Sequence, residues 1–171
     1  HTLYSTDELM QNCIADLGRR TTTEQDAPWF TFSHEAENPV LAGGENCSTL
    51  NVEFSSIQTT SFHYDAESGL YERWSCGEQL TDYKTGEVTK VKNVFVLGTT
   101  TSLYPDGVHA DISLSGGDGY YASEGKLVPI LWSTDETGRF VITQADGTEL
   151  PVNPGKSYIC LNLDSYEPTW E

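Results

Sequence analysis

The sequence predicts a mainly β fold, either an antiparallel β-sandwich or a partly closed barrel, with one short N-terminal helix. Runs rich in aromatic and β-branched residues recur every ~8–12 residues from Cys47 onward, between turns rich in Gly, Asp and Pro. Helical periodicity occurs once, close to the N-terminus. This spacing is typical of folds in which each short strand is followed by a tight turn.

The predicted helix covers about residues 5–18. Ser5 and Glu8 fit a capping box, in which Ser5 is the N-cap and the Glu8 side chain reaches back toward it. Gly18 is placed to end the helix in a left-handed conformation. Between these ends, apolar side chains recur on one face at Leu9, Cys13, Ile14 and Leu17.

An acidic stretch follows over 34–46 and contains Pro39 and two adjacent glycines, which is typical of a linker. We therefore predict a boundary there. Residues 1–45 hold the helix, and residues 46–171 form an antiparallel β domain.

The most regular part of the β domain is the stretch 61–97, which predicts two consecutive hairpins. The first hairpin turns at 65–69. The second turns at 84–86 and leads into the apolar run 94–97.

Another hairpin is predicted further along the chain, where 120–123 pairs with 126–132 across Glu124-Gly125. The glycine-rich segment 116–119 is predicted to break the chain before it.

The chain is strongly acidic, with nine Lys and Arg against 26 Asp and Glu and a net charge of -17. This charge repels a phosphate backbone, so we predict no nucleic-acid partner. No run approaches the ~20 apolar residues of a membrane span.

The cysteines lie far apart in sequence, at Cys13, Cys47, Cys76 and Cys160. No CxxC pair occurs, which argues against a zinc ribbon or a thioredoxin-type site, and we predict no cofactor and no metal site. Four cysteines allow three pairings, and their spacing does not choose among them. From the residues alone we favour reduced or partly paired thiols.

His1 is the one residue that suggests redox chemistry. A mature N-terminal histidine offers an amine and an imidazole, which with His34, His63 or His109 could bind copper in an oxidative polysaccharide enzyme. Cleavage that happens to expose His1 explains the same observation. A polysaccharide- or cell-wall-active hydrolase is the other enzyme hypothesis, and it requires two carboxylates at a defined separation.

His109 and Asp111 share a strand face and could form a pair, with Ser113 or Ser115 as a nucleophile. All four residues would lie along one strand, whereas catalytic triads draw their members from separate elements. We therefore interpret them as a solvent-facing polar stripe.

The candidate ligand-binding residues are Tyr71, Arg73, Trp74 and Asp82. Arg73 could be held by Asp82 one hairpin away, either as a salt bridge that sets the register or as part of a site. Tyr71, Trp74 and Tyr83 could instead form an aromatic platform for a glycan or peptide, although sheet aromatics often belong to the core.

Several short motifs also occur in a fixed order: 1–5 (HTLYS), 64–65 (YD), 69–73 (GLYER), 82–87 (DYKTGE), 93–96 (NVFV), 117–121 (GDGYY), 125–126 (GK), Trp132 and 153–159 (NPGKSYI). The ordered set with its gaps resembles the YerB-like family of bacterial putative lipoproteins, whose two domains are of unknown function.

The resemblance implies that residues 46–171 are the C-terminal β domain of that family and residues 1–45 the tail of its N-terminal α/β domain. It implies an extracytoplasmic protein anchored through an upstream lipid-modified cysteine, a location that two disulfides would suit. The expected role is non-enzymatic binding or scaffolding at the cell envelope. Expected partners are the rest of the N-terminal domain and an envelope protein or glycan.

Overall fold

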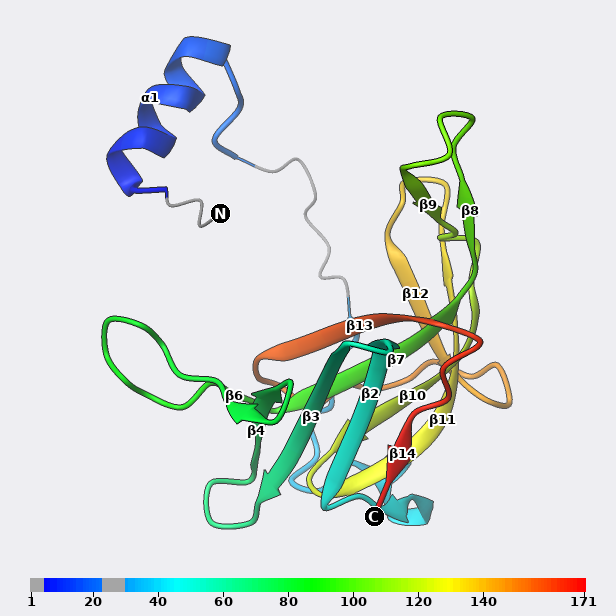
Figure 1. Cartoon of the computed structure of the whole chain (residues 1–171). Coiled ribbons are helices and arrows are strands. Elements are labelled where there is room, and N and C mark those ends of the chain that lie inside the picture. Colours follow the sequence, from blue (N-terminus) through cyan, green and yellow to red (C-terminus); the bar gives the residue numbers. More distant parts are fainter. Residues whose placement is uncertain (1–4, 23–29) are drawn as a thin grey trace.

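The computed structural model describes residues 5–22 and 30–171. Most of the chain forms two β-sheets that pack face to face, which we call sheet I and sheet II (Figure 1). In spatial order, sheet I contains β1 (Glu45–Asn46), β11 (Lys126–Thr134), β10 (Gly117–Ser123), β7 (Asn93–Thr99) and β13 (Ser157–Leu163), with β12 (Phe140–Gln144) also paired to β11.

Sheet II contains, in spatial order, β14 (Thr169–Trp170), β2 (Thr49–Ser55), β3 (Gln58–Asp65), β4 (Leu70–Ser75) and β5 (Glu78–Gln79), with β6 (Lys90–Val91) also paired to β4. A small third sheet pairs β8 (Thr101–Leu103) with β9 (Ala110–Ile112) and projects away from the sandwich (Figure 1). The prediction of a mainly β fold is confirmed, and the sandwich is open rather than a closed barrel.

Two of the predicted hairpins are present. β3 and β4 pair antiparallel across the turn at 65–69, where Gly69 has a φ of 67°. β10 and β11 pair across Glu124 and Gly125, which both have positive φ. The segment 116–119 differs from its prediction, because Gly117 already lies in β10 and pairs with Trp132.

The second predicted hairpin is only partly correct. The chain reverses at 84–86, where Thr81 bridges Val88, and returns to sheet II as β6. The apolar run 94–97, however, belongs to β7 in sheet I. There it pairs antiparallel with β10 and parallel with β13, which lies about 60 residues further along the chain.

β7 is apolar without alternation because both of its faces are buried. Val94 and Val96 face sheet II in the core between the two sheets, together with Leu50 and Phe62. Phe95 and Leu97 pack into a second core on the other face of sheet I. A strand buried on both sides needs an apolar residue at each position rather than at every second one.

The helix α1 (Asp7–Leu17) is present, but its N-cap is Thr6 and not Ser5 as predicted. The Thr6 hydroxyl accepts a hydrogen bond from the Leu9 backbone N–H at 3.3 Å, and Thr is among the residues preferred at an N-cap. Gly18 ends the helix with a φ of 59°, as predicted. No side chain of α1 is buried, and the helix lies apart from the sheets in Figure 1. In the part of the chain that is described, no helix is long and apolar enough to cross a membrane.

Candidate functional site

A cleft of ≈ 580 Å³ lies at one end of the sandwich, on the face of sheet I that is turned toward sheet II. Four adjacent strands of sheet I form its floor: β11, β10, β7 and β13. The segment 163–168, which leads from sheet I to β14 in sheet II, forms its wall. The residues that determine its chemistry are Gly98, Asp118, Tyr120, Leu131, Asn162 and Asp164.

The strand register places these residues in two adjacent rows. Asp118 on β10 pairs with Leu131 on β11, and Asn162 on β13 pairs with Gly98 on β7. Together these four residues form the outer row. Tyr120 lies two residues further along β10, in the inner row that also contains Val96 and Cys160 and continues into the core between the sheets. The cleft is therefore the uncovered continuation of the inter-sheet core.

Gly98 allows the wall to approach the floor. A Cβ atom at this position would lie 2.8 Å from Asp164 Oδ1 and 2.9 Å from the backbone oxygen of Asp118. Both distances are shorter than real Cβ contacts, so any larger residue would push the Asp164 carboxylate away. The hydrogen bond from the Asp164 backbone N–H to the Thr99 carbonyl, at 3.0 Å, holds the carboxylate in this place.

Asn162 is the buried polar residue of the cleft, with 2% of its surface exposed. Its side-chain NH₂ donates a hydrogen bond to the backbone carbonyl of Tyr166, which fixes the fold of the wall and the orientation of the amide. Its Oδ1 atom has no hydrogen-bond partner among the described residues. A buried acceptor without a donor costs about 1–3 kcal/mol.

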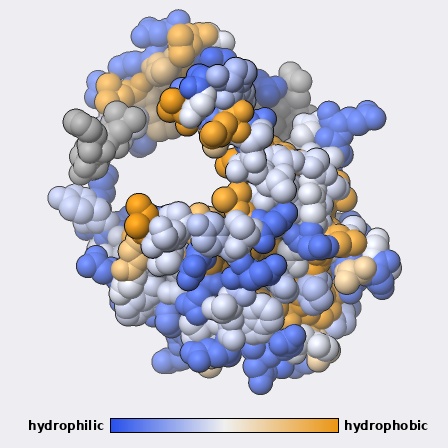
Figure 2. All heavy atoms as spheres, turned by 45° about the vertical axis from the view of Figure 1, so that its right-hand side comes forward, coloured by the Kyte–Doolittle hydropathy of each residue, from blue (hydrophilic) through white to orange (hydrophobic). Residues whose placement is uncertain are grey.

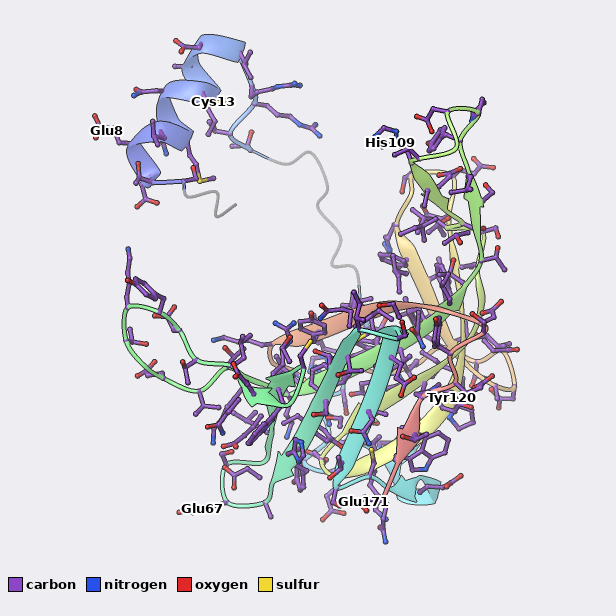
Figure 3. All side chains as sticks on the ribbon, in the orientation of Figure 1. Glu8, Cys13, Glu67, His109, Tyr120 and Glu171 are labelled. Carbon is purple, nitrogen blue, oxygen red and sulfur yellow. The ribbon has the colours of Figure 1, made fainter. Side chains whose placement is uncertain are left out.

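The cleft is also electronegative. Asp118, Asp164 and Glu167 line it, and the described lining contains no Lys, Arg or His. Burial raises the pKa of the Tyr120 hydroxyl, and the charges of Glu167, Asp118 and Glu45 raise it further. The Tyr120 ring, whose position is labelled in Figure 3, lies 5.2 Å from the Trp170 ring of β14.

The four residues proposed from the sequence do not form one site. Tyr71 is fully buried, and its hydroxyl donates a hydrogen bond to the Cys47 carbonyl at 2.9 Å. Arg73 shares the inner face of β4 with Tyr71, and its guanidinium carbon lies 4.6 Å from the centre of the Tyr158 ring. Trp74 faces the other side of β4, where its ring lies 5.3 Å from that of His63.

The predicted contact between Arg73 and Asp82 is absent from the described part of the chain. The Asp82 carboxylate accepts hydrogen bonds from the backbone N–H groups of Lys84 and Thr85, at 2.9 and 2.8 Å. These bonds lower the pKa of Asp82, and through them the carboxylate stabilises the turn in which it lies. Tyr83 is 93% exposed in the same turn, so the proposed aromatic platform with the buried Tyr71 is not formed.

The alternative in which His109 pairs with Asp111 is not formed among the described residues. His109 Nδ1 lies 2.6 Å from Asp106 Oδ2, within the turn that joins β8 to β9. In Figure 3 His109 lies at the end of this projecting hairpin, far from Tyr120. The Ser113 and Ser115 hydroxyls contact each other at 2.8 Å. His1 lies outside the described residues, and no three His, Cys, Asp or Glu side chains among those described gather as a metal site.

All four cysteines are free thiols, Cys47 and Cys160 in the inter-sheet core and Cys13 and Cys76 at the surface. Sequence reasoning missed the cleft because its floor combines residues from four strands. One signal in the sequence was available, the motif Gly117-Asp118-Gly119 directly before Tyr120. Glycines inside a strand often mark a place where another backbone approaches closely, and here they do not end the strand.

Comparison with known proteins agrees with this fold. The chain is 27% identical over 165 residues to "Putative lipoprotein YerB" of Bacillus subtilis (strain 168), covering 93% of this chain and 47% of that protein. The crystal structure of the YerB protein from Bacillus subtilis matches with a TM-score of 0.74 at 24% identity, covering 95% of this chain and 53% of that one.

The chain thus spans about half the length of these relatives. The family described as "Protein of unknown function (DUF3048) C-terminal domain" matches residues 50–159, which is most of the two sheets and of the cleft floor. The chain therefore belongs to the DUF3048 C-terminal domain family.

Proposed function

We propose that the chain is a non-enzymatic binding domain of a lipid-anchored protein, that it works outside the cytoplasm, and that it holds its ligand in the cleft at the end of the sandwich. The observation that carries this proposal is the Asn162 oxygen, which is buried beside the cleft without a donor. A ligand that supplies a donor would recover the free energy that this burial costs. The lipid anchor and the location rest on the similarity to a protein named a putative lipoprotein.

The test is a binding screen by ¹⁵N NMR with soluble envelope components, namely muropeptides, polysaccharide fragments and short peptides. We expect a bound component to shift the amide signals of Gly98, Asp118 and Asn162 and to be recovered intact by mass spectrometry. Cleavage or oxidation of the component would contradict the proposal and favour the polysaccharide-active enzyme. Shifts confined to other regions would also contradict it.

A matched pair of variants makes the screen specific to the cleft. Leu131 lies in the cleft and is 38% exposed, while Val141 on β12 is 37% exposed and does not line it. Leu131→Arg should abolish binding because the long side chain fills the cleft. Val141→Arg adds the same charge at the same exposure and should leave binding unchanged.

We also propose that residues 1–45 are the tail of a preceding α/β domain in a longer protein, and that α1 packs against that domain. α1 has 11 residues, and isolated helices shorter than ~12–15 residues are marginal in water. Its apolar side chains face solvent, with Leu9, Met10 and Leu17 exposed by 54–61%. In the space-filling view of Figure 2, orange hydrophobic and blue hydrophilic atoms lie side by side in the upper part of the molecule.

Hydrogen exchange tests this packing. The amides of α1 should exchange at least tenfold more slowly in a protein that includes the preceding domain than in the 171-residue chain. In the longer protein, Leu17→Ser should remove this protection, and Asn12→Ser, which changes an exposed polar residue of α1, should not. Equal exchange rates in the two proteins would contradict the proposal.

A further inference from the structure

The cleft presents hydrogen-bond acceptors without donors to match them. Asn162 Oδ1 is buried without a partner among the described residues, Asp118 and Asp164 line the same cleft, and Asp164 Oδ1 lies close to Gly98. The Asn162 amide cannot turn to present its NH₂ instead, because the Tyr166 carbonyl that holds it can only accept a hydrogen bond. A ligand must therefore bring N–H or O–H donors to this end of the cleft.

The charges select among such ligands. The described lining has three carboxylates and no cationic side chain. An anion would be repelled there, whereas an ammonium or guanidinium group would form charge-assisted hydrogen bonds to the carboxylates. A second cleft is lined by Lys90, Lys92 and Lys156 together with Glu72 and Glu87, so its lining differs from this one by containing cationic side chains.

The remaining surface of the cleft favours an organic cation over a metal ion. Val96, Leu131 and Pro168 supply apolar walls next to the acceptors. The Tyr120 ring adds an aromatic face, which attracts ammonium and guanidinium groups. In the described part of the chain, no three carboxylate, histidine or cysteine side chains converge closely enough to bind a metal.

We propose that the cleft binds a primary ammonium or guanidinium group carried on an aliphatic stem, such as the side chain of a lysine or arginine in a peptide. Asn162 Oδ1, Asp118 and Asp164 accept hydrogen bonds from the cation, and the apolar walls cover its stem. This inference rests on the proposed function, because it names the chemistry of the ligand that the cleft would hold.

The experiment uses Nα-acetyl-lysine methylamide as the probe and Nα-acetyl-norleucine methylamide as its neutral counterpart, with the ¹⁵N-labelled 171-residue chain. The lysine derivative should shift the amide signals of Gly98, Asp118 and Asn162 in a saturable manner. The norleucine derivative should bind at least roughly tenfold more weakly than the lysine derivative, because it lacks the charge-assisted hydrogen bonds.

Variants separate the cleft from the general attraction of a cation to an acidic protein. Asp118→Asn and Asp164→Asn change exposed side chains and should each weaken binding of the lysine derivative roughly tenfold. Asp111→Asn on β9 makes the same change in net charge outside the cleft and should have no effect. Equal weakening by all three variants would overturn the proposal.

The outcomes also distinguish this inference from the proposed function. Equal binding of the lysine and norleucine derivatives in the cleft would overturn the cation proposal and leave a binding domain with a neutral ligand. Shifts of the same signals by CaCl₂ alone, and by neither amino-acid derivative, would overturn it in favour of a metal ion. If no compound of either screen shifts the cleft signals, both proposals fail.

Discussion

The guanidinium of Arg73 lies over the ring of Tyr158, with 4.6 Å between the guanidinium carbon and the ring centre. Arg73 belongs to β4 in sheet II and Tyr158 to β13 in sheet I, so this contact joins the two layers of the sandwich. The Arg73 Nε atom is buried without a hydrogen-bond partner among the described residues. The Tyr158 ring therefore contacts this cation in place of the carboxylate that the sequence suggested.

A double-mutant cycle measures this contact. Arg73→Met and Tyr158→Leu should show a coupling free energy of about 1–2 kcal/mol in chemical denaturation, because the cation–π pair is partly desolvated. The matched cycle pairs Arg73→Met with Asp82→Asn, and its coupling should be close to zero. A larger coupling to Asp82 than to Tyr158 would restore the salt bridge predicted from the sequence.

Tyr121→Phe should destabilise the fold by about 2 kcal/mol or more in urea denaturation. The Tyr121 hydroxyl donates to Asn93 Oδ1 at 2.9 Å and accepts from the Asn153 backbone N–H at 3.0 Å, all in the interior. The change leaves Asn93 Oδ1 and the Asn153 backbone N–H buried without their hydrogen bonds to Tyr121. Tyr83→Phe is the control, because Tyr83 is 93% exposed and its loss should change stability by less than about 0.5 kcal/mol.

Thiol modification at pH 8 should divide the cysteines into two classes. Burial raises the pKa of Cys47 to about 11 and that of Cys160 to about 12, so neither forms much thiolate at this pH. Cys13 and Cys76 are exposed and should react with a disulfide reagent within minutes. Denaturant should release the other two thiols. A total below four after denaturation would reveal a disulfide, and rapid reaction of Cys47 in the native chain would contradict its burial.

Lys90 should stabilise the fold through Asp65 near neutral pH, and this contribution should be lost in acid. Its Nζ lies 2.9 Å from Asp65 Oδ2 and 2.9 Å from Glu72 Oε1. Hydrogen bonds from Ser68 and then Lys90 lower the pKa of Asp65 from its usual 3.8 to about 2. Because this pKa is depressed on folding, the stabilisation is present above pH 3.8 and is lost as the pH falls toward 2.

Carboxyl ¹³C NMR follows this titration directly. In Lys90→Met the pKa of Asp65 should rise but stay below 3.8, because the Ser68 hydrogen bond remains. Lys126→Met removes a lysine that contacts Asn46 instead and should leave the Asp65 pKa unchanged. An unchanged pKa in Lys90→Met would show that the ion pair is screened by water.

Local patterns in the sequence predicted several elements well. α1 ends at Gly18 as expected, the β3–β4 hairpin turns at 65–69, and the β10–β11 hairpin turns at Glu124-Gly125. In each case the information lies within a few residues, because turn conformation and side-chain periodicity depend on neighbours in the chain.

The pairing of distant strands could not be predicted in the same way. The run 94–97 is apolar at every position, which suits a strand buried on both faces, but nothing local says which sheet contains it. Its parallel pairing with β13 depends on a connection of some 60 residues that carries no local signal. The wrong assignment of Arg73 has the same origin, because its partner lies in the other sheet.

The sequence by itself determined the mainly β class, the position of the single long helix among the described residues, two of the hairpins and the family resemblance. Only the tertiary structure decided that Tyr71 is in the core and that Gly98, Asp118 and Asn162 lie in one row. The physical reason is that a turn or a helix cap is stabilised by adjacent residues. The cleft depends on the strand register, and the register is determined by contacts between residues that are far apart in the chain.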